Sequence, residues 1–408
     1  MMCPGCYKTN SDGYCLNCRK LLFDGARVSH VLPFDPPKAD NLPAYQQKTK
    51  WLSISGVQLK YSIQLNGKDL VFTETDGQYI LKPVPPNGLI AAQEQAPENE
   101  HLTMQIASRI FNIKTAANAL IYFKDGTPAY LTRRFDRKSD GTKFLQEDMA
   151  QISGVSRLTK GENFKYEGTY EDIGHLIKQH VAAIQPTLEN YFRLVLFNYV
   201  FSNGDAHLKN FSLIQTPMGD YSLAPAYDLM CTRLHTPLEN DTALDLYDGD
   251  MEGEFYGTYG FYGQPEFRNL AKRIGILPVR IERILTQLLT HRDRVEQMIQ
   301  NSFLNNEAKS NYQKGYHDKV VRLGMTKTMI AEKINSAYPF VYAPTTAPTK
   351  LIFLDRSIKV GYFQHRADFE RLEAENKYTF IEFVNKDKND PFTIVDGDIL
   401  SNVEYPSI

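Results

Sequence analysis

The chain reads Gly204-Asp205-Ala206-His207-Leu208-Lys209-Asn210-Phe211 in the stretch that decides its fold. This stretch follows residues 188–199, in which apolar side chains recur at helical spacing around most of the circumference, so a buried helix is expected before it. A carboxylate shortly before a carboxamide, on a loop after a core helix, can accept a hydroxyl proton at Asp205 and hold Mg²⁺ at Asn210. For any one of these residues, a helix cap at Asn203 or Asp205 is the simpler explanation.

A predicted hairpin brings a second acid back to this loop. Residues 211–214 and 221–224 have the composition of strands, and Met218-Gly219-Asp220 lies between them as a turn. The hairpin is expected to place Asp228 beside Asn210, so that two oxygen ligands face one Mg²⁺ site. Taken alone, Asp228 would be read as part of a surface turn.

The residues before the hairpin divide into a sheet-rich part and a helical part. Residues 52–81 alternate apolar and polar side chains in short runs that break at Asn66-Gly67 and Asp76-Gly77, which is typical of an antiparallel sheet. Leu102, Ile106 and Ile110 then follow at helical spacing, and residues 124–127 indicate a second hairpin. Helical patterns dominate after residue 140. A sheet-rich part followed by a helical part is the order of the two lobes in ATP-dependent kinases. Taken by itself, this likeness of fold is only an analogy.

The first part also holds candidate phosphate ligands. Residues 53–60 join small side chains to a strand, which lets backbone N–H groups approach phosphates, although one glycine makes a weak motif and a plain turn is the alternative. Lys82 ends a predicted strand and is expected either to point inward at phosphates or to lie solvated at an edge. Glu100 could brace Lys82, or could only complement the helix dipole.

These segments together resemble the HipA family of serine/threonine kinases, the toxins of bacterial toxin–antitoxin modules. The resemblance covers roughly residues 45–320 and is carried in order by residues 53–60, 79–83, 134–137, 145–149, 204–211 and 227–229. It implies an α+β, bilobal kinase fold with ATP and Mg²⁺ as cofactors. The implied catalytic residues are Asp205 as base with His207 and Lys209, and the implied Mg²⁺ ligands are Asn210 and Asp228. The implied ATP-binding residues are Ser55, Gly56, Val57, Gln58, Lys60, Lys82, Arg133, Arg134, Phe135, His207, Asn210 and Asp228, with residues 133–135 as the hinge at the adenine.

The length before the phosphate loop indicates a subtype. About fifty residues precede Ser53, fewer than in the long HipA form, so the chain resembles the short HipT-type kinases. The resemblance implies autophosphorylation at Ser53 or Ser55, where a dianion would repel ATP. It further implies an antitoxin of the HipB or HipS type as partner, DNA contact only through that antitoxin, and a protein substrate such as an aminoacyl-tRNA synthetase.

Four of the five cysteines form two Cys-x-x-Cys pairs at the N-terminus. Without an export signal a disulfide framework is not expected, and Cys3, Cys6, Cys15 and Cys18 suit a tetrahedral Zn²⁺ site, with a redox pair as the alternative. Such a knuckle is expected to dock on the protein rather than bind nucleic acid.

Composition and spacing give the expected domains and location. The 408 residues carry a net charge of −2 and are 42% hydrophobic, which suits a folded chain without a strong field toward nucleic acid or membranes. No apolar stretch of spanning length is visible, so a cytoplasmic protein without membrane contact is expected. We expect a zinc knuckle in residues 1–25, a linker in 26–44, a kinase N-lobe in 45–134, a C-lobe in 135–325, and a small α+β extension of unknown role in 338–408.

Two functions remain open from the sequence. The first is an active kinase that arrests translation by modifying a protein. The second is a nucleotide-binding regulator or pseudokinase that acts through a partner or DNA. The intact residues Asp205, Asn210 and Asp228 favour the first.

Overall fold

The computed structural model describes residues 2–37, 59–74, 76–85, 90–138 and 140–325, together with five strands between residues 349 and 404. Two compact units make up the chain, residues 1–248 with 267–322 and residues 249–266 with 323–408. Within the described residues, no helix is both long enough and apolar enough to cross a bilayer.

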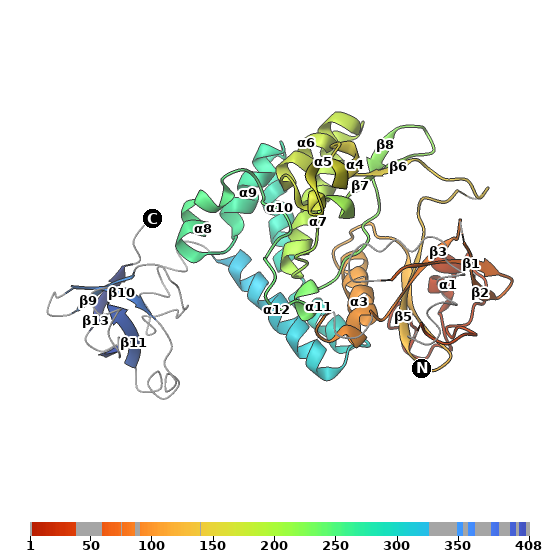
Figure 1. The fold of residues 1–408 in the computed structure, drawn as a ribbon, viewed down its shortest axis with the longest axis horizontal. Helices are drawn as coiled ribbons and strands as arrows, with labels where there is room; N and C mark the ends of the chain where they lie inside the picture. The colour runs from red at the N-terminus through yellow and green to blue at the C-terminus, as the bar shows by residue number, and fades with distance from the viewer. Residues whose placement is uncertain are drawn as a thin grey trace. The chain divides into compact units, whose positions relative to one another are not determined.

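An antiparallel five-stranded sheet forms the first lobe, in the order β2-β1-β3-β5-β4. The expected hairpins are present, because Asn66 pairs with Asp69 across the first turn and Tyr122 pairs with Pro128 across the second. Helix α3 packs on β4 and β5, as the periodicity predicted (Figure 1). The strands are β1 (Tyr61–Asn66), β2 (Asp69–Phe72), β3 (Tyr79–Pro83), β4 (Asn118–Tyr122) and β5 (Pro128–Arg133), and the helices are α3 (Ala96–Arg109) and η1 (Gln93–Gln95).

Side chains on β3 alternate between two faces of this sheet, and the alternation fixes the direction of Lys82. Tyr79 and Leu81 belong to a buried apolar cluster on one face. Lys82 therefore points to the other face, where it meets Glu100 of α3. Burial on both faces explains why a strand lysine lies inside the protein and not at a solvated edge.

The N-terminal segment covers the first face of the sheet. Helix α1 (Leu16–Phe23) contributes Cys18, Leu22 and Phe23 to the apolar cluster that contains Leu81. The hydroxyl of Tyr14 donates to the carbonyl of Leu120 at 2.7 Å. The cysteine-rich segment is thus docked on the lobe, as expected.

The segment expected to be a linker also packs on the sheet. Val28 and Leu32 are buried in the same cluster. The amide of Leu32 donates to the carbonyl of Tyr122 at 2.7 Å, and the amide of Tyr122 donates to the carbonyl of His30 at 2.9 Å. Its extended backbone therefore runs beside β4.

Helices and one small sheet form the second lobe (yellow to cyan in Figure 1). The predicted hairpin is present as β7 and β8, and β6 extends it in the order β6-β7-β8. The strands are β6 (Gln146–Asp148), β7 (Ser212–Gln215) and β8 (Tyr221–Leu223). The helices are α4 (Met149–Ile152), α5 (Arg157–Lys160), η2 (Phe164–Tyr166), α6 (Tyr170–His180), α7 (Ile184–Val200), η3 (Leu208–Asn210), η4 (Thr232–Leu234), α9 (Gln264–Arg273), α10 (Pro278–Leu289), α11 (Arg292–Gln300) and α12 (Asn306–Gly324).

The second unit contains a separate five-stranded antiparallel sheet in the order β12-β11-β10-β9-β13. The sequence pattern predicts strand segments at residues 351–354, 360–363 and 378–384; strands are present there, and two further strands follow them. The pattern also predicts a short charged helix near residues 366–376, which lie outside the described residues. The elements are η5 (Asp250–Glu252), α8 (Glu254–Tyr259), β9 (Thr349–Phe353), β10 (Ile358–Phe363), β11 (Lys377–Glu382), β12 (Phe392–Asp396) and β13 (Leu400–Glu404).

Candidate active site

A cavity of about 310 Å³ lies where the sheet lobe meets the helical lobe. Lys60 and Lys82 line it from the first lobe, and Tyr227 and Asp228 line it from the second. Arg133, Arg134 and Phe135, predicted at the adenine hinge, lie on its wall as well. The structure therefore brings together residues that are more than a hundred positions apart in the sequence.

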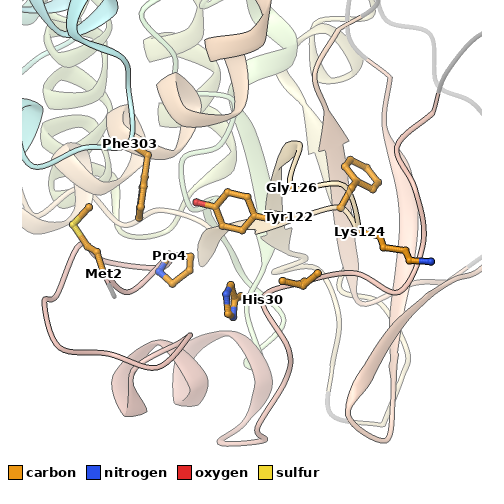
Figure 2. Close-up of a pocket in the computed structure, with 9 residues that line it drawn as sticks. Met2, Pro4, His30, Tyr122, Lys124, Gly126 and Phe303 are labelled. Carbon is orange, nitrogen blue, oxygen red and sulfur yellow. The ribbon is translucent and has the colours of Figure 1, made fainter.

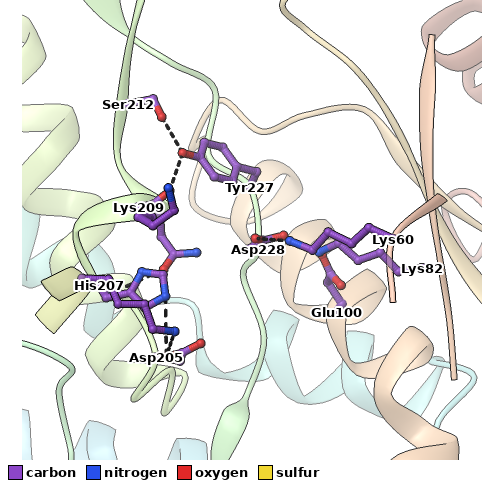
Figure 3. Close-up of polar contacts among 11 residues, drawn as sticks. Lys60, Lys82, Glu100, Asp205, His207, Lys209, Ser212, Tyr227 and Asp228 are labelled. Atoms are coloured by element: carbon purple, nitrogen blue, oxygen red, sulfur yellow. Dashed lines mark hydrogen bonds and ion pairs between the residues drawn. The ribbon is translucent and has the colours of Figure 1, made fainter. Parts of the chain in front are cut away.

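Two lysines and two carboxylates meet in this cavity (Figure 3). The ammonium of Lys82 donates to Glu100 Oε1 at 2.5 Å and also pairs with Asp228 Oδ1. The Nζ atom of Lys60 lies 3.2 Å from Asp228 Oδ2. The predicted brace between Glu100 and Lys82 is thus present, and the four formal charges cancel.

Burial and charge act in opposite directions on these groups. Burial raises the pKa of Glu100 to about 7, although the neighbouring Lys82 lowers it. Burial also disfavours the charged form of Asp228, but the ammonium groups of Lys60 and Lys82 hold its pKa well below the usual range. Asp228 is therefore an anion whose charge is balanced by lysines, and a phosphate group would compete with it for the same lysines.

The backbone at Asp228 is itself unusual. Its φ is 54°, in the left-handed region that non-glycine residues seldom adopt. Just before it, the hydroxyl of Tyr227 donates to the carbonyl of Lys209 at 2.8 Å. Strained backbone of this kind persists at functional sites where the surroundings hold it. The hairpin thus returns Tyr227 to the loop, and the expected placement of Asp228 beside Asn210 stays a prediction.

The loop predicted to be catalytic begins where α7 ends. Ser202 has a φ of 50°, which turns the chain out of the helix. The carboxamide oxygen of Asn210 then accepts a hydrogen bond from the backbone amide of His207 at 3.1 Å. Asn210 therefore fixes the loop through one lone pair, and its oxygen retains a second lone pair for a metal ion.

The Asp205 carboxylate is half exposed, with 50% of its side chain accessible. The hydroxyl of Tyr166 donates to Asp205 Oδ1 at 2.6 Å, and the Nζ atom of Lys165 lies 3.7 Å from the same oxygen. His207 Nε2 is 3.8 Å away. Burial lowers the pKa of His207 to about 4, despite the attraction of Asp205, so its imidazole is neutral at pH 7.

Some predicted residues point elsewhere. The ammonium of Lys209 lies 2.8 Å from Asp148 Oδ2, at the start of α4. The guanidinium of Arg133 binds both oxygens of Asp24 at 2.8 Å, so this side chain ties the hinge strand to the end of α1. Among the described residues, Asp228 lines the cavity. The predicted loop residues Asp205, His207, Lys209 and Asn210 are not part of its lining.

The predicted phosphate loop lies almost entirely outside the residues that the structure describes. Residues 53–58, which include Ser53, Ser55, Gly56, Val57 and Gln58, lie outside the described residues. Lys60, at the end of this predicted segment, is among the described residues, and its ammonium points at Asp228.

Sequence reasoning missed several partners of the site residues. They are Asp24, Asp148, Lys165 and Tyr166. Lys165-Tyr166 carries no periodic or turn signal, and only the packing of η2 against η3 brings it to Asp205. Asp148 lies in residues 145–149, one of the segments that carry the family resemblance, but the spacing does not predict its pairing with Lys209.

The four N-terminal cysteines form a second cluster. Their Sγ atoms lie within 4.8 Å of one another, and Cys6 and Cys15 are 3.6 Å apart. A tetrahedral Zn²⁺ with Zn–S bonds near 2.3 Å requires sulfur separations of about 3.8 Å, so the arrangement fits this ion. A side chain at Gly5 would place its Cβ 2.8 Å from Cys18 Sγ, so the turn tolerates only glycine.

A second cavity, of about 280 Å³, lies beside this cluster (Figure 2). Met2, Pro4, Tyr122 and Phe303 line it, and its surface is mostly apolar. It lacks the paired charges of the first cavity, so the first is the better candidate for a nucleotide.

Comparison with known proteins supports this interpretation. The family model described as HipA-like C-terminal domain matches residues 52–299. A protein of Haemophilus influenzae that is named as a candidate kinase is 27% identical over 310 residues, covering 72% of this chain and 87% of its own. The serine/threonine-protein kinase toxin HipA of Shewanella oneidensis is 29% identical over 217 residues, covering 48% of this chain and 47% of its own.

A solved structure shares the fold. It is the Shewanella oneidensis complex of HipA, HipB and operator DNA, in which the matched chain gives a TM-score of 0.53 at 19% identity, covering 72% of this chain and 73% of that one. At this identity the likeness is one of fold. The chain spans about half the length of the HipA toxin that it matches in sequence. Because the family model covers more than half of the chain, the chain belongs to the HipA-like family of serine/threonine kinases.

Proposed function

We propose that the chain is an ATP-dependent serine/threonine protein kinase that acts as the toxin of a HipA-type toxin–antitoxin module. The observation that carries this proposal is the buried meeting of Lys82 with Glu100 and Asp228, next to the loop that holds Asp205. A lysine braced by a helix glutamate is the arrangement by which kinases hold the phosphates of ATP.

The cavity residues would bind ATP in defined roles. Lys60 and Lys82 would bind phosphate oxygens, which replace the Asp228 carboxylate as their partners. Arg134 and Phe135 would contact the adenine, and the backbone of residues 55–58 would cover the phosphates. Asp228 and Asn210 would hold Mg²⁺, which neutralises phosphate charge when it is bound.

Transfer needs a group that accepts a proton from the substrate hydroxyl. Asp205 would accept this proton while the hydroxyl oxygen bonds to the γ-phosphorus and the bond to the bridging oxygen of ADP breaks. The half-exposed carboxylate supports a protein side chain as acceptor, because a macromolecule can reach it from solvent.

The toxin role rests on the relatives. One relative is named a kinase toxin, and the matched solved structure contains HipB and operator DNA. We therefore assign this chain an antitoxin partner of HipB or HipS type, contact with DNA only through that partner, and a cytoplasmic location. A translation component such as an aminoacyl-tRNA synthetase is the expected substrate, and phosphorylation of Ser53 or Ser55 is expected to silence the enzyme.

The cysteine cluster is assigned to Zn²⁺. The compact set of four thiols and the absence of space at Gly5 support a metal-closed knuckle. Its position on the sheet, and the contact of Asp24 with Arg133, support a structural role rather than a nucleic-acid contact.

Phosphate transfer from labelled Mg²⁺-ATP to the chain itself tests the proposed activity. Asp205→Ala is expected to abolish labelling while ATP affinity stays within about twofold, whereas Asp228→Ala is expected to weaken Mg²⁺-ATP binding as well. Asp220→Ala is the matched control, because Asp220 is exposed in the turn between β7 and β8. Wild-type protein that binds ATP but transfers no phosphate to itself or to a partner would favour the pseudokinase alternative.

A further inference from the structure

Three side chains converge on one oxygen of Asp205. Tyr166 Oη is 2.6 Å, Lys165 Nζ 3.7 Å and His207 Nε2 3.8 Å from Oδ1. All three contacts are made to Oδ1, and none of the three involves Oδ2. They therefore hold the carboxylate by one of its oxygens.

Aromatic packing holds the segment that carries Tyr166 against the loop. The Tyr166 ring meets the His207 ring edge-on, with centroids 5.3 Å apart. Phe164, at the other end of η2, lies under the ammonium of Lys209 at 6.0 Å. Each end of this short 3-10 helix thus contacts a side chain of the loop that carries Asp205.

We propose that Tyr166 is a positioning residue for the proposed base, aided by Lys165, and that it orients Asp205 Oδ2 toward the acceptor hydroxyl. This inference rests on the proposed function. The hydroxyl of Tyr166 donates a charge-assisted hydrogen bond, which fixes the rotation of the carboxylate. The ammonium of Lys165 also lies over the Tyr166 ring at 4.8 Å, which keeps both groups at the same oxygen.

Tyr166→Phe isolates this hydrogen bond, because phenylalanine keeps the ring that packs on His207. Its kcat is expected to fall roughly 10- to 100-fold, the range of a hydrogen bond to a charged group, while the Kd for Mg²⁺-ATP is unchanged. Lys165→Met is expected to give a smaller loss in kcat. Tyr221→Phe on β8 is the matched control and should behave as wild type.

The split between kcat and nucleotide affinity separates positioning from a general structural effect. Tyr166→Phe removes the hydroxyl that donates to Asp205 Oδ1 and keeps the ring that packs on the His207 ring. A loss confined to kcat therefore reports the lost hydrogen bond.

Each other outcome overturns the inference. An unchanged kcat would mean that the contact is incidental, and a raised kcat would mean that Tyr166 blocks the base. Loss of Mg²⁺-ATP affinity together with kcat would mean that the ring only supports the fold. If the wild-type protein transfers no phosphate, the proposed function and this inference both fail. If the wild-type protein is active and Tyr166→Phe has the same kcat, only this inference fails.

Discussion

Replacing Lys82 by methionine should destabilise the protein and weaken nucleotide binding, for separable reasons. The Lys82 side chain is 4% exposed and that of Glu100 is 1% exposed, so the two charges form a buried pair. Removing one member of such a pair leaves the other without a partner and costs about 3–5 kcal/mol of unfolding free energy. The cost is expected to grow as the pH rises above 7, because burial raises the pKa of Glu100 to about 7 even with Lys82 beside it. Without Lys82 the carboxyl must either take up a proton or stay ionised without a partner.

The loss of nucleotide affinity follows from the same lysine. An ammonium about 4 Å from a phosphate charge gains about 4 kcal/mol at an effective dielectric of ~20. Lys82 already contacts Asp228 in the free protein, and it gives up part of that contact when ATP binds. A net loss of about 1.4–2.8 kcal/mol is therefore expected in Lys82→Met, which is roughly a 10- to 100-fold rise in the Kd for Mg²⁺-ATP.

A double variant separates the two effects. Lys82→Met with Glu100→Gln removes both charges of the buried pair, so most of the lost stability should return while nucleotide affinity stays low. Urea denaturation at pH 8 gives the unfolding free energies, and calorimetric titration gives the Kd values. The reasoning is refuted if the double variant is as unstable as Lys82→Met, or if it binds Mg²⁺-ATP like the wild type.

The remaining predictions concern metal, pH and the phosphate loop. Cys15→Ser with Cys18→Ser should abolish the one Zn²⁺ per chain that metal analysis is expected to find in wild type, and retained stoichiometric zinc would contradict the assignment. Burial raises the pKa of Glu98 from 4.5 to about 7, so Glu98→Gln should stabilise the fold by up to about 3 kcal/mol at pH 8 and little at pH 5, measured by denaturation at both pH values. Acidic replacements at Ser53 and Ser55 should lower ATP affinity and growth arrest, whereas a doubly acidic variant that binds ATP and stops growth like the unmodified enzyme would rule out silencing by phosphorylation of this loop.

Elements with a local signal could be predicted from the sequence. The turns at Asn66-Gly67 and Met218-Gly219-Asp220 fixed two hairpins, because these residues accept the backbone angles that tight turns need. The helix before residue 200 was evident from its apolar circumference. The return of the chain to the loop of Asp205, where the Tyr227 hydroxyl donates to the Lys209 carbonyl, followed from the hairpin.

Contacts between distant segments could not be predicted in the same way. Lys165 and Tyr166 lie on a short 3-10 helix whose position depends on the packing of the neighbouring helices. Lys209 was expected among the catalytic residues, and its pairing with Asp148 at the start of α4 was not foreseen. Arg133 lines the cavity, but the pairing of its guanidinium with Asp24 was not foreseen either. Each of these outcomes is decided by a partner that no spacing rule identifies.

The cysteine cluster and the cavity lined by Lys82 lie on opposite faces of one sheet. The sheet therefore connects two features that the sequence places far apart. On β3, Leu81 packs into the apolar core with Cys18, while its neighbour Lys82 enters the cavity. On β5, Leu131 packs toward the cysteines, while Tyr130 lies beneath the ammonium of Lys82 at 5.3 Å. Close-packed interiors transmit displacement. The segment that holds the four thiols therefore packs against the strand that carries Lys82, on the face opposite the cavity.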